Sequence, residues 1–183
     1  MRVIAGKYRH INLVAPEGKN VTRPTLDRIK EAMFNILNIK VMDSIVVDLF
    51  SGSGALGIEA LSRGAKFVYF NDLDKEANRC ILTNLKTIKA NSSDYELIKL
   101  NYLDCLNYLK EKNIKIDILL LDPPYLNNIY EEIIYYCLEN ELLNNNAKVV
   151  IETLYSNKVN LDEFNYKEYK YGEKKLLVVN INK

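Results

Sequence analysis

The sequence has one histidine and three cysteines in 183 residues, and these scarcities exclude several kinds of site. With His10 as the sole imidazole, a histidine-centred metal site or a Ser-His-Asp triad is nearly excluded. Cys80, Cys105 and Cys137 are odd in number, widely spaced and without a CxxC pair, so neither a disulfide framework nor a zinc site is indicated. We interpret them as small buried hydrophobic residues. No metal cofactor is therefore expected.

Long apolar runs are also absent. No run approaches the roughly 20 residues of a membrane span, and residues 1–10 lack the apolar core of a signal peptide. A length of 183 residues suggests one domain, and 48% hydrophobic and 27% charged residues are ordinary for a globular protein. We therefore expect a protein of the reducing cytoplasm with no membrane partner.

The charge is distributed unevenly along the chain. Residues 1–40 carry a net charge of +5 and the remainder carries −4, which leaves the formal net charge at +1. A basic arm on a mildly acidic body suggests a polyanionic partner, such as a nucleic acid, that is contacted mainly by one end of the molecule.

The first segment shows a hairpin pattern. Two short β-prone runs, 2–5 and 11–14, are followed by a turn at 16–18, which predicts a β-hairpin. We therefore divide the chain into a basic hairpin extension, residues 1–20, and a main domain, residues 21–183.

A helical pattern follows, and Thr25 suits its N-cap. Apolar residues spaced at i, i+4, i+7 and i+8 predict one buried face of this helix. They are Ile29, Met33, Ile36 and Leu37.

From residue 45 onward, apolar runs typical of buried parallel strands alternate with helical patterns. The expected strands cover 45–50, 67–70, 96–100, 117–121 and 147–151; the expected helices cover 75–89, 103–111 and 129–139, with a short one ending at Gly64. This alternation predicts an α/β fold with a doubly wound parallel sheet. Two further strand-like runs, 166–169 and 176–181, predict an antiparallel C-terminal hairpin.

A glycine-rich turn joins the first expected strand to its helix, at residues 48–57 (DLFSGSGALG). Gly52 and Gly54 permit a tight turn and close approach of a ligand to the backbone. Asp72 stands 20 residues after Gly52, where an acid would bind ribose hydroxyls. The turn also matches GxGxxG, so it predicts a ligand that contains adenosine without choosing the cofactor.

The sequence Asp122-Pro123-Pro124-Tyr125 follows the expected strand 117–121. The prolines have no N–H, so their carbonyls and the Asp122 carboxylate can act as acceptors, and the Tyr125 ring offers a face for a planar base. Methylation of an exocyclic amino group needs this arrangement, because hydrogen bonds to Asp122 and the Pro123 carbonyl favour a pyramidal nitrogen and stabilise its developing positive charge. No strong general base is required, and a nicotinamide enzyme has no use for these groups.

Asp104 is a third acid near the carboxyl end of an expected strand. It is a candidate acceptor for an adenine amino group. The alternative interpretation is a solvated side chain or a helix cap.

The sequence resembles the RsmD family, bacterial methyltransferases that act on guanine N2 of small-subunit (16S) ribosomal RNA. The resemblance covers nearly the whole chain and rests on segments 2–9, 22–35, 48–64 and 122–125. The second segment, which contains Arg-Pro-Thr followed by Asp-Arg, is the most specific of the four. Two departures are His10-Ile11, where the family usually has Gly-Arg, and Leu26, where it commonly has Thr.

The resemblance implies a class I methyltransferase fold with a Rossmann-like sheet, S-adenosylmethionine as cofactor and RNA of the small-subunit particle as substrate. It places the methionine end of the cofactor at Asp48, Gly52 and Gly54. The ribose is assigned to Asp72 and the adenine to the neighbourhood of Asp104. Three further residues are expected to cover the bound cofactor: Arg23, Pro24 and Thr25. It assigns the target guanine to Asp122, Pro123, Pro124 and Tyr125, and RNA phosphates to the basic hairpin. From the charge of residues 1–40, the candidates for phosphate contact are Arg2, Lys7, Arg9 and Arg28.

Three other functions stay open from the sequence. The Asp-Pro-Pro-Tyr tetrapeptide also serves adenine-N6 methyltransferases acting on DNA or RNA, although we expect no room for a separate target-recognition domain. The others are a nicotinamide-dependent oxidoreductase and an RNA-binding module without catalysis. The sequence does not determine which nucleotide is modified, whether naked RNA or a particle is the substrate, or the oligomeric state, for which a monomer is our expectation.

Overall fold

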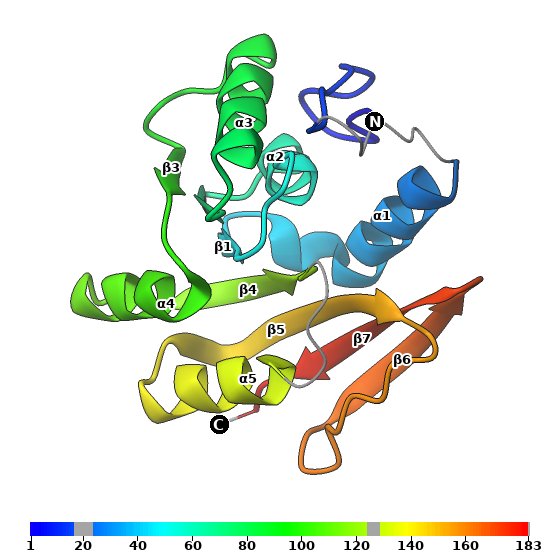
Figure 1. The fold of residues 1–183 in the computed structure, drawn as a ribbon, viewed down its shortest axis with the longest axis vertical. Coiled ribbons are helices and arrows are strands. Elements are labelled where there is room, and N and C mark those ends of the chain that lie inside the picture. Colours follow the sequence, from blue (N-terminus) through cyan, green and yellow to red (C-terminus); the bar gives the residue numbers. More distant parts are fainter. Residues whose placement is uncertain (17–23, 124–128, 183) are drawn as a thin grey trace.

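The computed structural model describes residues 1–16, 24–123 and 129–182, which form a seven-stranded mixed sheet flanked by helices (Figure 1). The strands are β1 (Ile45–Asp48), β2 (Phe67–Asn71), β3 (Tyr95–Ile98), β4 (Ile116–Leu121), β5 (Leu143–Leu154), β6 (Tyr166–Tyr171) and β7 (Lys174–Asn180). The helices are α1 (Pro24–Leu37), the short 3-10 helix η1 (Asn38–Val41), α2 (Ala55–Ser62), α3 (Lys75–Thr87), α4 (Tyr102–Glu111) and α5 (Ile129–Glu139).

The order of the strands is β3-β2-β1-β4-β5-β7-β6. Strands β1 to β5 pair in parallel, whereas β7 lies antiparallel between β5 and β6. The chain moves outward from β1 to β3 and then returns to β4 on the other side of β1. The carboxyl ends of β1 and β4 therefore form the switch point at which doubly wound sheets bind ligands. The structure thus confirms both the predicted parallel sheet and its antiparallel hairpin.

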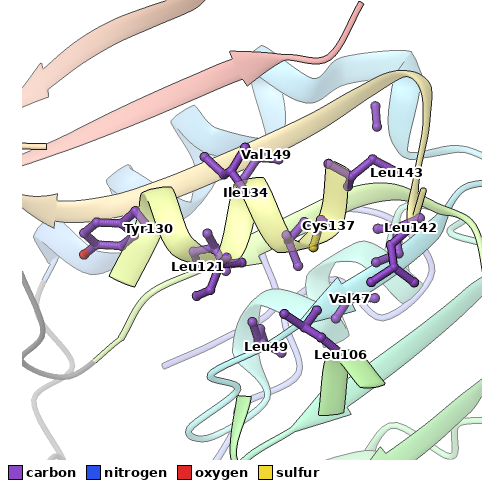
Figure 2. Close-up of a cluster of buried hydrophobic side chains, with 14 of the residues drawn as sticks. Val47, Leu49, Leu106, Leu121, Tyr130, Ile134, Cys137, Leu142, Leu143 and Val149 are labelled. Carbon is purple, nitrogen blue, oxygen red and sulfur yellow. The ribbon is translucent and has the colours of Figure 1, made fainter. Parts of the chain in front are cut away.

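Both faces of the sheet are buried at its central strands, which explains the near-continuous apolar runs of β1 and β4. Val46 belongs to a buried cluster with α1, α2 and α3, whereas its neighbour Val47 belongs to a cluster with α4 and α5. Figure 2 shows this second cluster, in which Leu106 comes from α4, Leu121 from β4 and Ile134 from α5. The two layers of helices hold the strand ends in fixed positions at the switch point.

Two of the three cysteines lie in the α4/α5 cluster. Cys105 and Cys137 are completely buried, as predicted, and burial raises the pKa of each thiol to about 12. A thiol that does not ionise is a poor nucleophile. Cys80 departs from the prediction because it is only partly buried; on α3 the adjacent Ile81 takes the core position.

The N-terminal arm, residues 1–16, contains no regular strand, but its two ends pair antiparallel as predicted: the N–H groups of Val3 and Leu13 donate to the carbonyls of Ile11 and Met1 at 2.9 and 2.8 Å. Arg2 and Asn12 form a single antiparallel bridge. The pairing does not extend past Val3, because the buried Glu59 carboxylate of α2 accepts the N–H groups of Ile4 and Ala5 at 2.8 and 3.0 Å. The arm is therefore a folded loop bonded to α2. The predicted turn at 16–18 and the boundary at residue 20 lie largely outside the described residues.

Most element boundaries differ from the predictions by a few residues, and two of these differences have a clear physical reason. Helix α1 begins at Pro24, so Thr25 is its second residue and not its N-cap. Proline suits the first helical position, because it lacks the N–H that would otherwise be unpaired there. Strand β5 is longer than expected because its pairing with β7 continues to Leu154 opposite Lys174. Among the described residues, no helix has the length and apolar composition needed to span a membrane.

Candidate active site

The predicted glycine turn lies between β1 and α2, at the switch point. Gly52 and Gly54 have φ of +54° and +78°, a conformation that glycine adopts without strain. A Cβ at Gly52 would meet no atom within 4 Å, whereas one at Gly57 would lie 2.3 Å from Cε1 of Phe70. Gly57 therefore serves the packing of α2 against β2, and Gly52 leaves open space for a ligand next to the backbone.

Asp48 is buried beneath this turn. Its Oδ2 accepts the N–H of Gly57 at 2.9 Å, and Ser51 Oγ donates to its backbone carbonyl at 2.7 Å. Burial, with a smaller contribution from the carboxylate of Asp72, raises the pKa of Asp48 to about 7. The structure thus shows Asp48 holding the start of α2, while its predicted contact with the methionine end of the cofactor stays a prediction.

Asp72 follows β2 directly, as predicted, and the structure brings it to Gly52. Its Oδ2 accepts the N–H of Gly52 at 2.8 Å, and its Oδ1 accepts the N–H of Asp74 at 2.9 Å. The preceding Asn71 is buried and donates its side-chain amide to the Leu49 carbonyl at 3.1 Å. The ends of β1 and β2 are therefore held together at the proposed ribose site.

Two exposed leucines that the sequence analysis did not single out flank this carboxylate. Leu73 follows Asp72 and is 68% exposed, and Leu100 lies two residues after β3 and is 36% exposed. For Leu73 the sequence held a signal, because an apolar residue stands directly after Asp72, the acid that follows a strand. Such side chains offer an apolar surface to a planar base.

Asn78 provides a further polar atom beside Asp72. Its amide nitrogen donates to the backbone carbonyls of Asp72 and Asp74 at 3.0 and 2.8 Å. Its Oδ1 is buried and has no hydrogen-bond partner among the described residues. Unpaired buried oxygens are rare in native structures. Together with the Asp72 carboxylate and the open space at Gly52, this acceptor fits an adenosine-containing ligand that carries donors.

Asp104 lies in the first turn of α4 and not before the helix. Asn101 is the N-cap: its side-chain oxygen accepts the Asp104 N–H at 2.9 Å, and its amide donates to the Asp104 carboxylate. The cap is therefore Asn101, and Asp104 is the residue in the first turn to which this cap bonds. Contact with adenine stays a prediction for this exposed side chain.

Asp122 and Pro123 follow β4 and lie beside the glycine turn, because β4 pairs with β1 and the Leu49 N–H donates to the Leu120 carbonyl at 3.2 Å. Asp122 is exposed and Pro123 is buried. Pro124 and Tyr125 lie outside the described residues, so their predicted roles stay predictions.

Two basic residues of the arm, Lys7 and Arg9, lie away from the glycine turn. The N–H of Lys7 donates to the Ser62 carbonyl at 2.7 Å, at the end of α2 opposite to Gly54. An eight-residue helix is about 12 Å long. Lys7 and Arg9 are exposed at that distant end.

The other basic candidates differ in their surroundings. Arg2 forms an exposed ion pair with Asp27 at 3.3 Å, and Arg28 is exposed on α1. Lys30 is 4% exposed and pairs with Glu59 at 3.1 Å, so it contributes to the charge of residues 1–40 without being available to RNA. Arg23 and the side chains of Pro24 and Thr25 lie outside the described residues.

Asn84 of α3 connects the arm to the glycine turn, and the sequence analysis missed it. Its side chain exchanges hydrogen bonds with the N–H and carbonyl of Val14 at 2.8 and 2.9 Å, and it donates to the Ser53 carbonyl at 2.8 Å. Because Val14 is 70 residues away in the chain, no local pattern could have signalled this contact.

Known proteins share this fold and much of this sequence. The Ribosomal RNA small subunit methyltransferase D of Haemophilus influenzae is 40% identical over 84% of this chain and 78% of its own length. The protein of the same name from Escherichia coli is 33% identical over 84% of this chain and 74% of its own. A solved Escherichia coli structure, provisionally named a methyltransferase, has a TM-score of 0.84 at 29% identity and covers 100% of this chain and 98% of its own.

The model of one protein family, described as Conserved hypothetical protein 95, matches residues 1–180. This range includes the arm, the glycine turn and the Asp-Pro-Pro-Tyr tetrapeptide. The chain belongs to this family, which is that of ribosomal RNA small subunit methyltransferase D.

Proposed function

We propose that this chain transfers a methyl group from S-adenosylmethionine to the exocyclic N2 amino group of a guanine in small-subunit ribosomal RNA. Membership of the family supports the reaction class. The structural observation that carries the proposal is Asp122, an exposed acceptor at the carboxyl end of β4, directly beside the glycine turn after β1.

The groups around the glycine turn suit the cofactor. Asp72 is placed to accept hydrogen bonds from ribose hydroxyls, and Leu73 and Leu100 offer an apolar surface to the adenine. The buried Oδ1 of Asn78 is available for a donor. When bound, S-adenosylmethionine supplies an electrophilic methyl group on a positively charged sulfur.

On the other side of the switch point, Asp122 and Pro123 orient the target. The Asp122 carboxylate and the Pro123 carbonyl accept hydrogen bonds from the guanine amino group, which directs the nitrogen lone pair out of conjugation with the ring. Held in this way, the amino group would accept the methyl group that bound S-adenosylmethionine would supply, with a neutral thioether as the leaving group. The same acceptors stabilise the positive charge that develops on nitrogen. Because Asp122 is exposed, the proton that the nitrogen loses can pass to water.

We also propose that the protein acts as a monomer, since Gly52, Asp72 and Asp122 all belong to one chain and lie at one switch point. A cytoplasmic location follows from the proposed substrate, because small-subunit RNA is found there in bacteria.

The test is transfer of a tritiated methyl group from S-adenosylmethionine to ribosomal RNA from a strain that lacks the enzyme. Nucleoside mass spectrometry of the product is expected to give N2-methylguanosine. N6-methyladenosine would identify an adenine methyltransferase instead, and stimulation by a nicotinamide cofactor without methyl transfer would overturn the proposed reaction class.

A further inference from the structure

The β6–β7 turn lies at the same edge of the sheet as the proposed active site. Leu154 at the end of β5 pairs with Lys174 at the start of β7, and Tyr171 at the end of β6 pairs with the same lysine. The turn therefore extends past the carboxyl ends of β4 and β5, as Figure 1 shows. Asp122, which follows β4, lies at this same edge of the sheet, and only β5 separates β4 from β7.

An aromatic ring and two lysines meet at this turn. Tyr155 is 44% exposed, and its N–H donates to the Glu173 carbonyl at 2.7 Å, which fixes the backbone next to the turn. The ammonium nitrogens of Lys170 and Lys175 lie 3.8 and 5.6 Å from the centroid of the ring. We call Tyr155, Lys170, Lys174 and Lys175 the hairpin surface.

The charges of this surface are unequally compensated. Lys174 pairs with the buried Glu152, and Lys175 pairs with Glu168 at 3.2 Å. Lys170 is exposed, and within the described parts of the chain it takes part in no ion pair. It is therefore the cation of this surface that can neutralise an external anion.

The hairpin surface is also electrostatically close to Asp122. Burial alone would lower the pKa of Lys174, but the carboxylates of Glu152 and Asp122 outweigh this effect and raise it. Residues 166–175 (YKEYKYGEKK) contain four lysines, three tyrosines and two glutamates. Alternation of basic and aromatic residues beside a site for a single base is typical of surfaces that bind single-stranded nucleic acid.

We propose that the hairpin surface binds the single-stranded RNA that flanks the target nucleotide. Lys170 contacts a phosphate, and the exposed part of the Tyr155 ring contacts the adjacent nucleoside. The inference rests on the proposed function, because it requires RNA as the substrate. It adds a second RNA-binding region, separate from Lys7 and Arg9 of the N-terminal arm at the far end of α2.

The test is the affinity of the full chain for a fragment of small-subunit ribosomal RNA at several salt concentrations. Lys170→Ala is expected to weaken binding about three- to tenfold and to lower the log–log salt slope by about 0.7, the value for one phosphate on a single strand. Tyr155→Ala is expected to weaken binding similarly, whereas Tyr155→Phe keeps the ring and should bind like the wild type. Lys66→Ala, at an exposed lysine just before β2 and hence at the opposite edge of the sheet, is the control.

Steady-state kinetics separate RNA binding from chemistry. Lys170→Ala is expected to raise KM for the RNA and leave kcat unchanged. If the wild type methylates the RNA but the Lys170 and Tyr155 variants bind it with unchanged affinity and salt slope, the hairpin surface does not bind RNA. The proposed function would then stand without this inference. If the wild type neither binds nor methylates ribosomal RNA, the proposed function and this inference fail together.

Discussion

The two sides of the switch point are built differently. On the β1/β2 side, the groups assigned to the cofactor are bonded to one another: Asp48 holds Gly57, Asp72 holds Gly52, and Asn84 joins the turn to the arm. The other side runs from β4 and β5 to the β6–β7 hairpin, and we call it the β4/β5 side. There the groups assigned to RNA, such as Asp122 and Lys170, are exposed. The comparison teaches that changes on the first side should alter folding and cofactor binding, whereas changes on the second should alter the reaction and RNA binding.

Asp48 offers the largest expected effect on the β1/β2 side, because its pKa rises from 3.8 to about 7 in the folded chain, mainly through burial. The folded state therefore keeps a proton that the unfolded state releases. The stabilisation from this group is complete below about pH 4 and is lost as the pH rises through about 7. A shift of about three pKa units corresponds to roughly 4 kcal/mol.

Asp48→Asn keeps an acceptor for the Gly57 N–H and is expected to remove this decline in the free energy of unfolding. Urea unfolding of the cofactor-free protein at about pH 5 and about pH 8 measures it. Asp43→Asn, at an exposed position with φ of +58° that asparagine tolerates, is the control. Parallel pH dependence in the wild type and in Asp48→Asn would show that Asp48 ionises normally.

Asp122 is the corresponding test on the β4/β5 side. Asp122→Ala is expected to lower the single-turnover rate of methyl transfer at least about 10²-fold, as for the loss of one preorganised contact to a developing charge. Cofactor affinity should be nearly unchanged, because Asp72, Leu73 and Asn78 are untouched. Rapid-quench kinetics with saturating RNA and calorimetric titration of S-adenosylmethionine measure the two quantities. A decrease in rate of less than tenfold would contradict the role of Asp122 as the acceptor for the amino group.

The contrast between the two sides also explains what the sequence could predict. Apolar periodicity located the strands, and in a parallel sheet the residues just after each strand meet at one edge, so Asp72 and Asp122 could be placed from their positions alone. The contacts of Asn84 with Val14 and of Glu59 with the arm join segments far apart in the chain, and no local spacing signals them. The arm was expected to be a hairpin because its composition is β-prone, and its two ends do pair antiparallel. Side chains of α2 and α3 accept several of its other N–H groups, so the pairing stays too short to form regular strands.

Asp72 tests whether the β1/β2 side binds the cofactor at its ribose. Asp72→Ala is expected to weaken S-adenosylmethionine binding by about 1–3 kcal/mol, the usual cost of leaving buried polar partners unpaired. Part of this loss should appear as lower thermal stability of the cofactor-free protein, because the N–H of Gly52 also loses its acceptor. Isothermal titration measures the affinity. Equal affinity in the variant and the wild type would contradict the assignment of the ribose to Asp72.

The smallest effect is expected at the arm, where the sequence and the structure point in different directions. The charge of +5 on residues 1–40 predicts that Lys7 and Arg9 contact phosphate, yet both lie at the end of α2 that is distant from the crevice. If each still neutralises one phosphate on a long substrate, changing both to Ala should lower the log–log salt slope of RNA binding by about 1.4–1.8. Their distance from the crevice means that kcat and cofactor affinity should not change.

The comparison is RNA affinity at several salt concentrations for the wild type, for the double variant of Lys7 and Arg9, and for a control in which exposed Lys66 and Lys86 are both changed to Ala. A lower slope in the first double variant alone would give the RNA a path along the whole length of α2, from the arm to Asp122. An unchanged slope, together with a lower slope for Lys170→Ala, would assign RNA binding to the β4/β5 side and leave the arm a structural role through Glu59 and Asn84. In that case the uneven charge along the sequence would mark a segment that packs against the cofactor side rather than one that recognises the substrate.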